Sequence, residues 1–501
     1  MMLNGPTEDK YKDSIVKIVT YSKVHDYLYP WMPPRQTANH GSGFIIFYEL
    51  KAYLLTSAHL VQNATLIYVR FSDESLNFLA SVDTIDHHAD LACLNIENAS
   101  FWEQAMPIEL GEMPNLRQKV HIMGFPDGGE EFHHLKSCVS RINVGRYQHS
   151  GVPLLLIQVD SMIGQGHYGG PAVYNDKVIG MAFQNADNGE NLGYLIPPTI
   201  IGHFLKDGAQ SLYKGFPYLA IHTQPLTTSL KQAFGLELVS TGIRVKKTDP
   251  LSSAKSLLLT DDILLALDDY LIKDDGTIET SFSHRVHYSY LISQKSIGEL
   301  VEATVWRNKT PIIVRIPLNF RCATTHAVHK EYDKSPSYYI YAGIVFTPLT
   351  KNYLKCKRIS NHDKYLLASK SDFDDEIVII NQVLLTRLNA EIGQYNSQIV
   401  KSLNNEKVKN LKHLKKLIEK FCKQGFILKL ESNILISIPP KMYGYNESIL
   451  KEFNIENASS KELKTSSPAP NLLPHFDLKK HPPTEQEDKA VNPQRPYPRS
   501  I

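Results

Sequence analysis

Short apolar runs separated by turn-forming residues dominate residues 12–205. Most of these runs are β-branched or apolar over a strand's length, and stretches such as "SDES" and "YNDK" separate them. They read "SGFIIF", "AYLLTSAHLV", "ATLIYVRF", "LACLNI", "KVHIMGFP", "LLLIQVD" and "KVIGMAFQ". Strands at this spacing, without intervening helices, are typical of an all-β barrel or sandwich. We therefore predict one mainly β domain over residues 10–207.

The pattern changes after residues 206–217, "KDGAQSLYKGFP", which are typical of a linker. A second unit, residues 216–320, mixes strands such as "VEATVWR" with short helical stretches. A third unit, residues 335–440, contains the clearest helix of the chain. Asn410 can cap this helix and Gly425 can end it. Its apolar residues fall on one face and are Leu411, Leu414, Leu417, Ile418 and Phe421.

The end of the chain has a different composition. Residues 461–501 hold eight prolines in 41 residues, with many Ser, Lys, Glu and Asn. Such a segment buries too little apolar surface to offset the entropy of the ordered chain. We predict a disordered, Pro-rich tail over residues 455–501.

Composition excludes several classes of protein. The chain has 501 residues, 42% of them hydrophobic, and a formal net charge of +2, so no global field favours nucleic acid. No apolar run approaches the roughly 20 residues of a membrane span, and the polar N-terminus has no secretory-signal pattern. The five cysteines are odd in number and form no CxxC pair, which favours a reducing compartment. We expect a cytoplasmic protein without a cofactor, although non-classical export or organellar targeting stays open.

Three separate motifs together indicate catalytic chemistry. His59 follows an apolar strand in "LLTSAHLV", and Asp90 precedes another in "HHADLACLNI". Further on, the glycines of "GQGHYGGPAV" allow a tight turn whose backbone N–H groups can point one way. Each motif alone is weak, since a histidine or aspartate beside a strand is usually structural. The order histidine, aspartate, glycine-rich elbow is that of chymotrypsin-type proteases.

With these motifs the chain resembles the Deg/HtrA family of PDZ-bearing, trypsin-like serine proteases, most of all its plant-type branch. "GSGFII", "GFPDGG", "VIGMAFQ" and "GYLIP" fit the family pattern as well. Residues 290–308, 341–350 and 375–393 are similar to its two PDZ domains. The resemblance implies a chymotrypsin-like double β-barrel followed by two α+β PDZ domains. It also implies a homo-oligomer.

One residue departs from this family. Where the family motif reads GNSGGP, residues 166–171 read "GHYGGP", so Tyr168 replaces the nucleophilic serine. By resemblance, His59 holds the position of the base and Asp90 that of the residue that orients it. The backbone N–H groups of Gly166, His167 and Tyr168 would form the oxyanion hole.

A phenol oxygen lies a whole ring away from a serine oxygen, and a displacement of about 1 Å can cost about 100-fold in rate. We therefore predict a pseudoprotease, a peptide-binding, chaperone-like or regulatory protein. The alternative is an active Deg/HtrA endopeptidase in protein quality control. For activity, Ser161 as a displaced nucleophile or His167 acting with a water are further alternatives.

The PDZ resemblance also implies peptide binding. PDZ domains add an extended peptide to a sheet edge and hold its C-terminal carboxylate in a backbone nest. The expected partners are unfolded or C-terminal peptide segments of proteins. In the second PDZ domain, residues 335–440, Gly343 would serve the nest. In the first PDZ domain, residues 216–320, the carboxylate loop would be Tyr218, Leu219, Ala220 and Ile221, with Ala220 where the family has glycine.

Two pairs of adjacent histidines raise the question of a metal site. His87–His88 and His133–His134 are candidates, but adjacent residues on an extended chain point to opposite faces. No cysteine or carboxylate is spaced to complete either site. We interpret both pairs as solvated turns and expect no metal.

Overall fold

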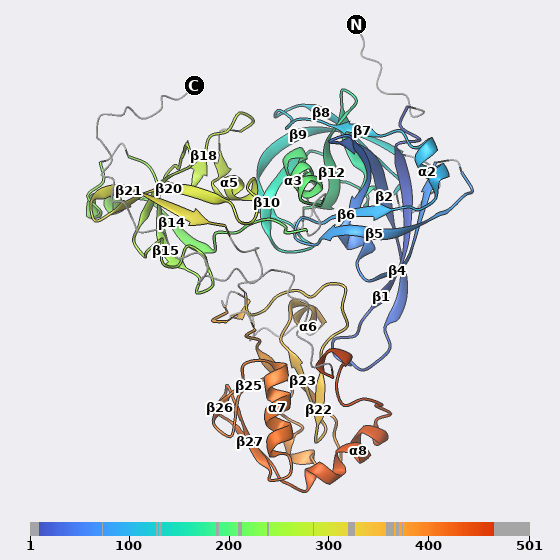
Figure 1. Cartoon of the computed structure of the whole chain (residues 1–501), viewed down its shortest axis with the longest axis vertical. Coiled ribbons are helices and arrows are strands. Elements are labelled where there is room, and N and C mark those ends of the chain that lie inside the picture. Colours follow the sequence, from blue (N-terminus) through green and yellow to red (C-terminus); the bar gives the residue numbers. More distant parts are fainter. Residues whose placement is uncertain are drawn as a thin grey trace.

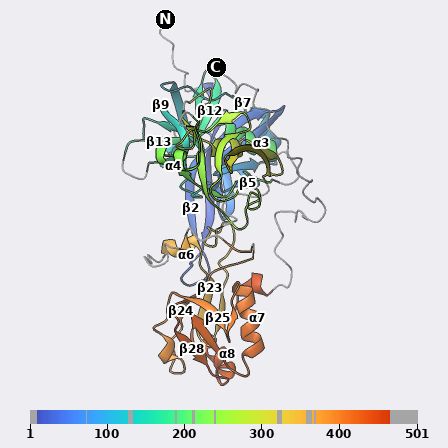
Figure 2. The ribbon, with the colours of Figure 1, turned by 90° about the vertical axis from the view of Figure 1, so that its left-hand side faces the viewer.

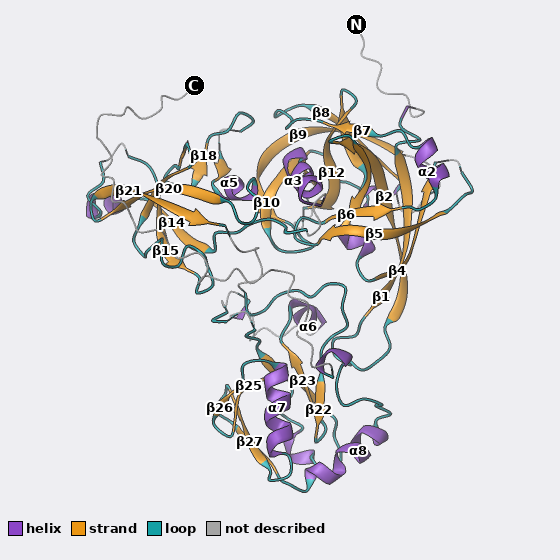
Figure 3. Ribbon diagram, viewed as in Figure 1, coloured by secondary structure: helices purple, strands orange, loops and turns teal. Residues whose placement is uncertain are grey.

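The structure is a computed structural model that describes residues 10–464 except for short gaps. The gaps are residues 73, 127–128, 130–132, 187–189, 209–212, 238–239, 284, 319–325, 357–364, 367–369 and 373. Three units are visible, with the first two side by side and the third below them in the view of Figure 1. Strands dominate all three units, as Figure 3 shows, which confirms the mainly β prediction. Of the predicted tail, residues 455–501, the part beyond residue 464 lies outside the described residues. Residues 455–464 pack against the final unit, so the predicted start of the tail was too early.

The first unit contains two closed barrels. In the first barrel the strand order is β1-β4-β5-β6-β3-β2, and pairing of β1 with β2 closes it. Its strands are β1 (Ile15–Val24), β2 (Arg35–Tyr48), β3 (Lys51–Ser57), β4 (Ala64–Phe71), β5 (Phe78–Asp86) and β6 (Leu91–Asn95).

The second barrel has the order β12-β11-β8-β9-β10-β13, closed by pairing of β12 with β13. Its strands are β8 (Lys119–Gly124), β9 (His133–Arg146), β10 (Pro153–Val159), β11 (Pro171–Tyr174), β12 (Lys177–Asn185) and β13 (Gly193–Ile196). The short strand β7 (Ile108–Leu110) pairs in parallel with both β2 and β12 and so joins the barrels. The predicted double barrel is therefore confirmed.

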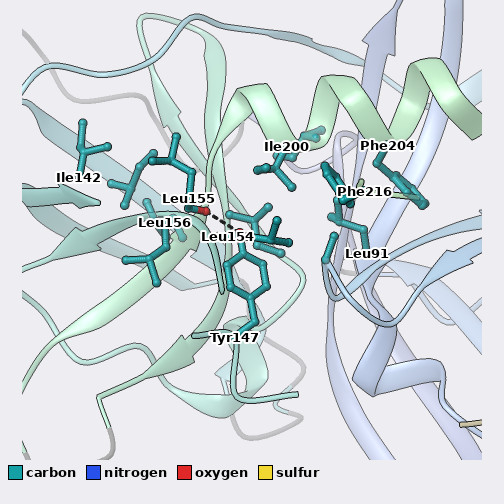
Figure 4. Packing of buried hydrophobic residues seen from close by; sticks show 14 of the residues in the cluster. Leu91, Ile142, Tyr147, Leu154, Leu155, Leu156, Ile200, Phe204 and Phe216 are labelled. Atoms are coloured by element: carbon teal, nitrogen blue, oxygen red, sulfur yellow. Dashed lines mark hydrogen bonds between the residues drawn. The ribbon is translucent and has the colours of Figure 1, made fainter. Parts of the chain in front are cut away.

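The barrel interiors are filled by the apolar runs of the sequence. Figure 4 shows Leu154, Leu155 and Leu156 of β10 and the nearby Tyr147 in one buried apolar cluster. The fully buried Tyr147 hydroxyl donates to the carbonyl of Leu155 over 2.7 Å, so its polar atom is satisfied. Two short helices, α1 (Ala58–Val61) and α2 (Ala99–Gln104), add Leu60, Val61 and Phe101 to the core of the first barrel. Helix α3 (Pro198–Gly208) ends within the predicted linker.

The middle unit is a twisted sheet in the order β14-β15-β16-β20-β21. Its elements are β14 (Ile221–Pro225), α4 (Thr228–Ala233), β15 (Ile243–Thr248), β16 (Ile263–Leu267), β17 (Tyr270–Leu271), β18 (Thr277–Ile278), β19 (Val286–His287), α5 (Ser289–Ser293), β20 (Leu300–Arg307) and β21 (Thr310–Pro317). Arg307 binds both carboxylate oxygens of the buried Asp262, at 2.8 and 2.6 Å. The core of this unit is continuous with that of the second barrel, so the two pack as one body.

The final unit has the sheet order β22-β23-β24-β25-β27-β28. Its elements are β22 (Tyr339–Tyr341), β23 (Ile344–Pro348), α6 (Lys351–Cys356), β24 (Val378–Val383), β25 (Gln398–Leu403), β26 (Glu406–Lys407), α7 (Leu411–Phe421), β27 (Phe426–Leu430), β28 (Leu435–Ile438) and α8 (Met442–Glu452).

Helix α7 confirms the predicted helix. The Asn410 side chain accepts from the backbone N–H of His413 over 2.7 Å as an N-cap. The described sheet also continues past the predicted end of this unit at residue 440. The N–H of Ile340 donates to the carbonyl of Ala458, and Ser459 bridges to Tyr339. The predicted boundary was too early because residues 458–459 pair with the edge strand β22, which lies more than a hundred residues earlier in the sequence.

The final unit contacts the first barrel at the tip of the long β1–β2 hairpin. Asn381 Nδ2 donates to the carbonyl of Tyr27, and Gln382 Nε2 to that of Leu28, both over 2.9 Å. Trp31 meets Tyr338 edge to face, with ring centroids 6.4 Å apart. In Figure 2 the long strands of the first barrel reach down toward β23 and β24.

Candidate functional site

His59 and Asp90 form a closely coupled pair. Strand β3 delivers His59 to the one-turn helix α1, and Asp90 ends the turn before β6. One Asp90 oxygen accepts from His59 Nδ1 at 2.7 Å, and the other accepts from the His59 backbone N–H at 2.8 Å. This two-point contact fixes both the position of the imidazole and its tautomer.

The Asp90 carboxylate is kept ionised although its side chain is only 1% exposed. Burial alone raises the pKa of Asp90, but the His59 imidazole and its hydrogen bonds bring that pKa below its ordinary value. The Asp90 backbone takes φ of +56°, and its carbonyl accepts the N–H of Ala58. A left-handed residue at this point turns the chain so that the carboxylate faces His59.

The glycine-rich elbow is built against Ser42 of β2. Ser42 Oγ donates to the carbonyl of Gly166 over 2.7 Å, and the Ser42 N–H donates to the carbonyl of Tyr168 over 3.0 Å. Gly169 has φ of +86°, and a Cβ there would lie 2.2 Å from the Ser42 carbonyl oxygen. Only glycine fits both constraints.

Of the predicted oxyanion-hole residues, Gly166 and His167 lie in the 3₁₀ turn Gln165–His167, and Tyr168 is its C-cap. The backbone N–H of His167 donates to the carbonyl of Gly164, and the backbone N–H of Tyr168 donates to the carbonyl of Gln165. In this conformation both N–H groups are used inside the turn. The role of these groups in an oxyanion hole stays a prediction, and it requires the turn to open.

The Tyr168 side chain lies beside His59. The two rings meet edge to face, with centroids 5.7 Å apart. Asn185 Nδ2 donates to the Tyr168 hydroxyl over 3.0 Å. Burial raises the pKa of Tyr168, and this hydrogen bond only partly offsets that effect. The phenol is therefore neutral, half-buried and anchored at its hydroxyl.

Asn185, at the end of β12, was missed from the sequence. Its side chain accepts from the N–H of Ile163 at 2.9 Å and donates to the carbonyl of the same residue at 2.7 Å. These bonds fix the segment just before the elbow and aim the amide at Tyr168. No local motif distinguishes this asparagine, because its role comes from residues elsewhere in the chain.

The two alternative sources of activity have different surroundings. His167 is 3% exposed, and its Nε2 lies 3.0 Å from Nδ1 of His133. Ser161 is half-buried, two residues before Ile163. Among the described contacts, the His59 side chain meets Asp90, Tyr168 and His149, and Ser161 is not one of them.

The prediction of solvated turns was wrong for the histidine pair at 133–134, which lies in a strand. His87–His88 do lie in a turn, but both residues are half-buried. His133 and His134 begin strand β9, and His134 Nε2 lies 2.5 Å from His121 Nδ1. Burial lowers the pKa of His134 to about 4. His87 has a side chain only 12% exposed and contacts His149, which sequence reasoning missed.

The predicted carboxylate loop of the middle unit ends at the start of β14, an edge strand of its sheet. Leu219 and Ala220 are buried, while Tyr218 and Ile221 are half-buried. Ala220 adopts φ of +50°, the left-handed conformation that favours glycine. The backbone thus keeps a glycine-like shape in spite of the added methyl.

In the final unit, Ala342 and Gly343 form the turn between β22 and β23, with φ of +53° and +80°. A Cβ on Gly343 would lie 2.2 Å from Asn389 Nδ2. The N–H of Ala342 already donates to Asn446 Oδ1 over 2.9 Å. Strand β22 also pairs with β23, so the edge to which a peptide would add is covered.

Comparisons with known proteins agree with this architecture. The trypsin-like peptidase domain family matches residues 41–181, and the PDZ domain family matches residues 328–462. No helix within the described ranges is long and apolar enough to span a membrane.

Among curated proteins of Arabidopsis thaliana, the chain is 33% identical to "Putative protease Do-like 3, mitochondrial" over 456 residues, which cover 90% of this chain and 80% of that one. It is 35% identical to "Protease Do-like 4, mitochondrial" over 426 residues, covering 85% and 80%. Among solved structures, "HtrA-type protease AlgW with decapeptide" is 20% identical with a TM-score of 0.47, covering 63% of this chain and 99% of that one.

Proposed function

The chain belongs to the Do-like (Deg/HtrA) family of trypsin-like proteases, and on that premise we propose that it is a catalytically impaired member that binds peptides. The observation that carries this proposal is Tyr168 at the position of the nucleophile, with its hydroxyl bound to Asn185. An anchored neutral phenol does not supply the oxygen that His59 would activate.

Two further features support impairment. The N–H groups of His167 and Tyr168 are used within the 3₁₀ turn and are not offered to a substrate carbonyl. The Tyr168 ring stands against His59, where a scissile peptide would have to approach. The remaining function is to hold unfolded or C-terminal peptide segments, as a chaperone-like or regulatory subunit.

The sheet edge at β14 is our candidate for peptide capture, as the edge of a first PDZ domain. Its loop, residues 218–221, has the left-handed Ala220 that a carboxylate nest requires. The corresponding edge in the final unit is occupied by β22, so we assign Gly343 a structural role. We also propose a homo-oligomer, and an organellar location in line with the mitochondrial names of the relatives.

The second candidate function is an active endopeptidase in protein quality control. It is favoured by the His59–Asp90 pair, which has the contacts that a working triad needs.

Casein digestion tests the proposal, using wild type and Tyr168→Ser, each with and without His59→Ala. We expect an inert wild type, cleavage by Tyr168→Ser, and loss of that cleavage in the double variant. Digestion by wild type that His59→Ala abolishes would establish the second candidate instead. Labelling of Ser161 by a fluorophosphonate would then identify the displaced nucleophile.

A further inference from the structure

A short segment of the chain packs against two histidines of the barrels, one of which lies beside His59. Residues Lys330 to Asp333 lie between the middle and final units and contact both barrels. The residues that they contact are His87, just before Asp90, and His149, in the β9–β10 turn. The His149 ring lies 6.0 Å from the His59 ring, so this contact borders the candidate catalytic pair.

The aromatic part of the contact is a stack. The Tyr332 ring lies flat on His87, with centroids 4.2 Å apart and planes only 5° from parallel. The Tyr332 hydroxyl donates to the carbonyl of His149 over 3.3 Å. A flat imidazole beside a backbone acceptor is a suitable surface for a phenol ring.

The acidic part of the contact uses both oxygens of one carboxylate. Asp333 Oδ1 accepts the backbone N–H of Asn63, and Oδ2 lies 2.5 Å from His87 Nε2. Burial raises the pKa of Asp333, but the His87 imidazole and the Asn63 N–H lower it below its ordinary value. The carboxylate is therefore ionised and doubly bound.

The hydrogen bonds of the two histidines run in one direction. Because His87 Nε2 donates to Asp333, its Nδ1 accepts from His149 Nε2 at 2.9 Å when both rings are neutral. The Lys330 ammonium then lies 3.5 Å from His149 Nδ1 and donates to the His149 carbonyl over 2.8 Å. Each donor in this series of hydrogen bonds therefore faces an acceptor.

We propose that His87, His149 and the Asn63 N–H form a peptide subsite that recognises an aromatic residue followed by an acidic one. In this structure Tyr332 and Asp333 of the chain itself occupy it. The groups that recognise them belong to the two barrels, Asn63 and His87 to the first and His149 to the second. A separate peptide with the same two residues therefore presents the same chemistry.

The surroundings leave room for a longer peptide. A cavity of about 490 Å³ begins at residues 333–335 and continues past Asn63 to Val82 and Ile85. The Asp333 side chain is 40% exposed, so the acidic end of the occupant is open to exchange. The internal segment, residues 330–333, therefore competes with any separate peptide for the subsite, and its covalent attachment raises its effective concentration there.

The inference deepens the proposed function, since it rests on peptide binding, but it does not depend on whether the elbow is inactive. It is tested with a fluorescent peptide of residues 329–335, HKEYDKS, blocked at both ends. Anisotropy is measured with the full-length wild type and with the Tyr332→Ala/Asp333→Ala variant, which removes the internal competitor.

We expect the variant to bind this peptide at least about 10-fold more tightly than wild type. Adding His87→Ala to the variant should abolish binding, and a peptide with its tyrosine replaced by alanine should not bind. Equal affinity for wild type and variant, or no binding above a scrambled peptide, would overturn the proposal. If circular dichroism shows that the double variant is unfolded, Asp333→Asn takes its place with the same expectations.

Because the readout is binding, failure here is separable from failure of the casein experiment. If wild type digests casein and the peptide results are as expected, the protein is an active protease with a subsite that its own segment occupies. If wild type does not digest casein and the peptide does not bind as expected, the impaired elbow is supported and the subsite is refuted.

Discussion

The hydroxyl of Tyr168 is bound by Asn185, 3.0 Å away, while its ring meets that of His59 edge to face. Tyr168, which we propose stands at the position of the nucleophile, is thus held by the second barrel. Its oxygen has a partner that takes no part in proton transfer to the histidine. This arrangement can be tested through stability as well as through activity.

Tyr168→Phe removes the hydroxyl and leaves Asn185 Nδ2 with the Ile163 carbonyl. We expect the free energy of unfolding to fall by about 1 kcal/mol, the usual net worth of one hydrogen bond. Urea denaturation measures this change, and Tyr174→Phe, at a more exposed tyrosine, is the matched control. An equal effect at both positions would show that the bond to Asn185 contributes nothing.

Gly169→Ala separates backbone strain from a steric clash. Both Gly169 and Gly298 have positive φ, but only at Gly169 would a Cβ meet another atom, the Ser42 oxygen at 2.2 Å. We expect Gly298→Ala to cost about 1 kcal/mol from strain alone, and Gly169→Ala to cost several times as much. The two are compared by chemical denaturation, and similar costs would contradict the close packing of the elbow.

Arg307→Met leaves the buried Asp262 carboxylate without its bidentate partner. Removing one member of such a pair costs about 3 kcal/mol, since the remaining charge stays desolvated. The control is Arg315→Met, whose partner Glu302 and own side chain are both exposed, and which should cost less than about 1 kcal/mol. Asp262→Asn added to Arg307→Met should recover part of the loss, and no recovery would argue against an uncompensated charge.

Acid should destabilise the fold through His149. Burial lowers the pKa of His149 to about 3, although the Asp90 charge opposes this shift. The unfolded chain, with a histidine pKa near 6.5, therefore binds protons before the folded chain does. Stability is complete above about pH 6.5 and falls progressively as the pH drops toward 3.

The melting temperature, followed between pH 7.5 and 4.5, measures this effect. His149→Gln should flatten the pH dependence, whereas substitution of the exposed His40 by glutamine should leave it unchanged. If the melting temperature depends on pH in the same way in all three proteins, a group other than His149 is responsible.

The sequence was sufficient to predict features that depend on neighbouring residues. Apolar patterns predicted a mainly β first domain and helix α7. The double barrel and the roles of His59 and Asp90 were predicted from the resemblance to a protease family. Asn185, His149 and Tyr332 carry no such signal, because each acquires its role from a residue far along the chain. Tyr332, for example, stacks on a histidine more than two hundred positions earlier.

The end of the final unit illustrates the same limit. Residues after 440 look polar and turn-rich, yet Ile455 is buried and Ser459 pairs with Tyr339. That pairing depends on a free strand edge at β22, which composition does not reveal. The histidine pair at 133–134 was misread for a related reason, since its partners lie on facing strands and in the elbow.

The grip of β24 on the β1–β2 hairpin has a consequence for synthesis of the protein. Asn381 and Tyr27 are 354 positions apart, so at ordinary ribosomal speeds the amide emerges roughly 20–70 s after the carbonyl that it binds. Throughout that time the barrel can close, but the tip of its first hairpin has no anchor. The tip of the first hairpin is therefore synthesised early but anchored late. A ribosome that stalls before β24 would carry a barrel whose hairpin tip lacks these contacts with the final unit.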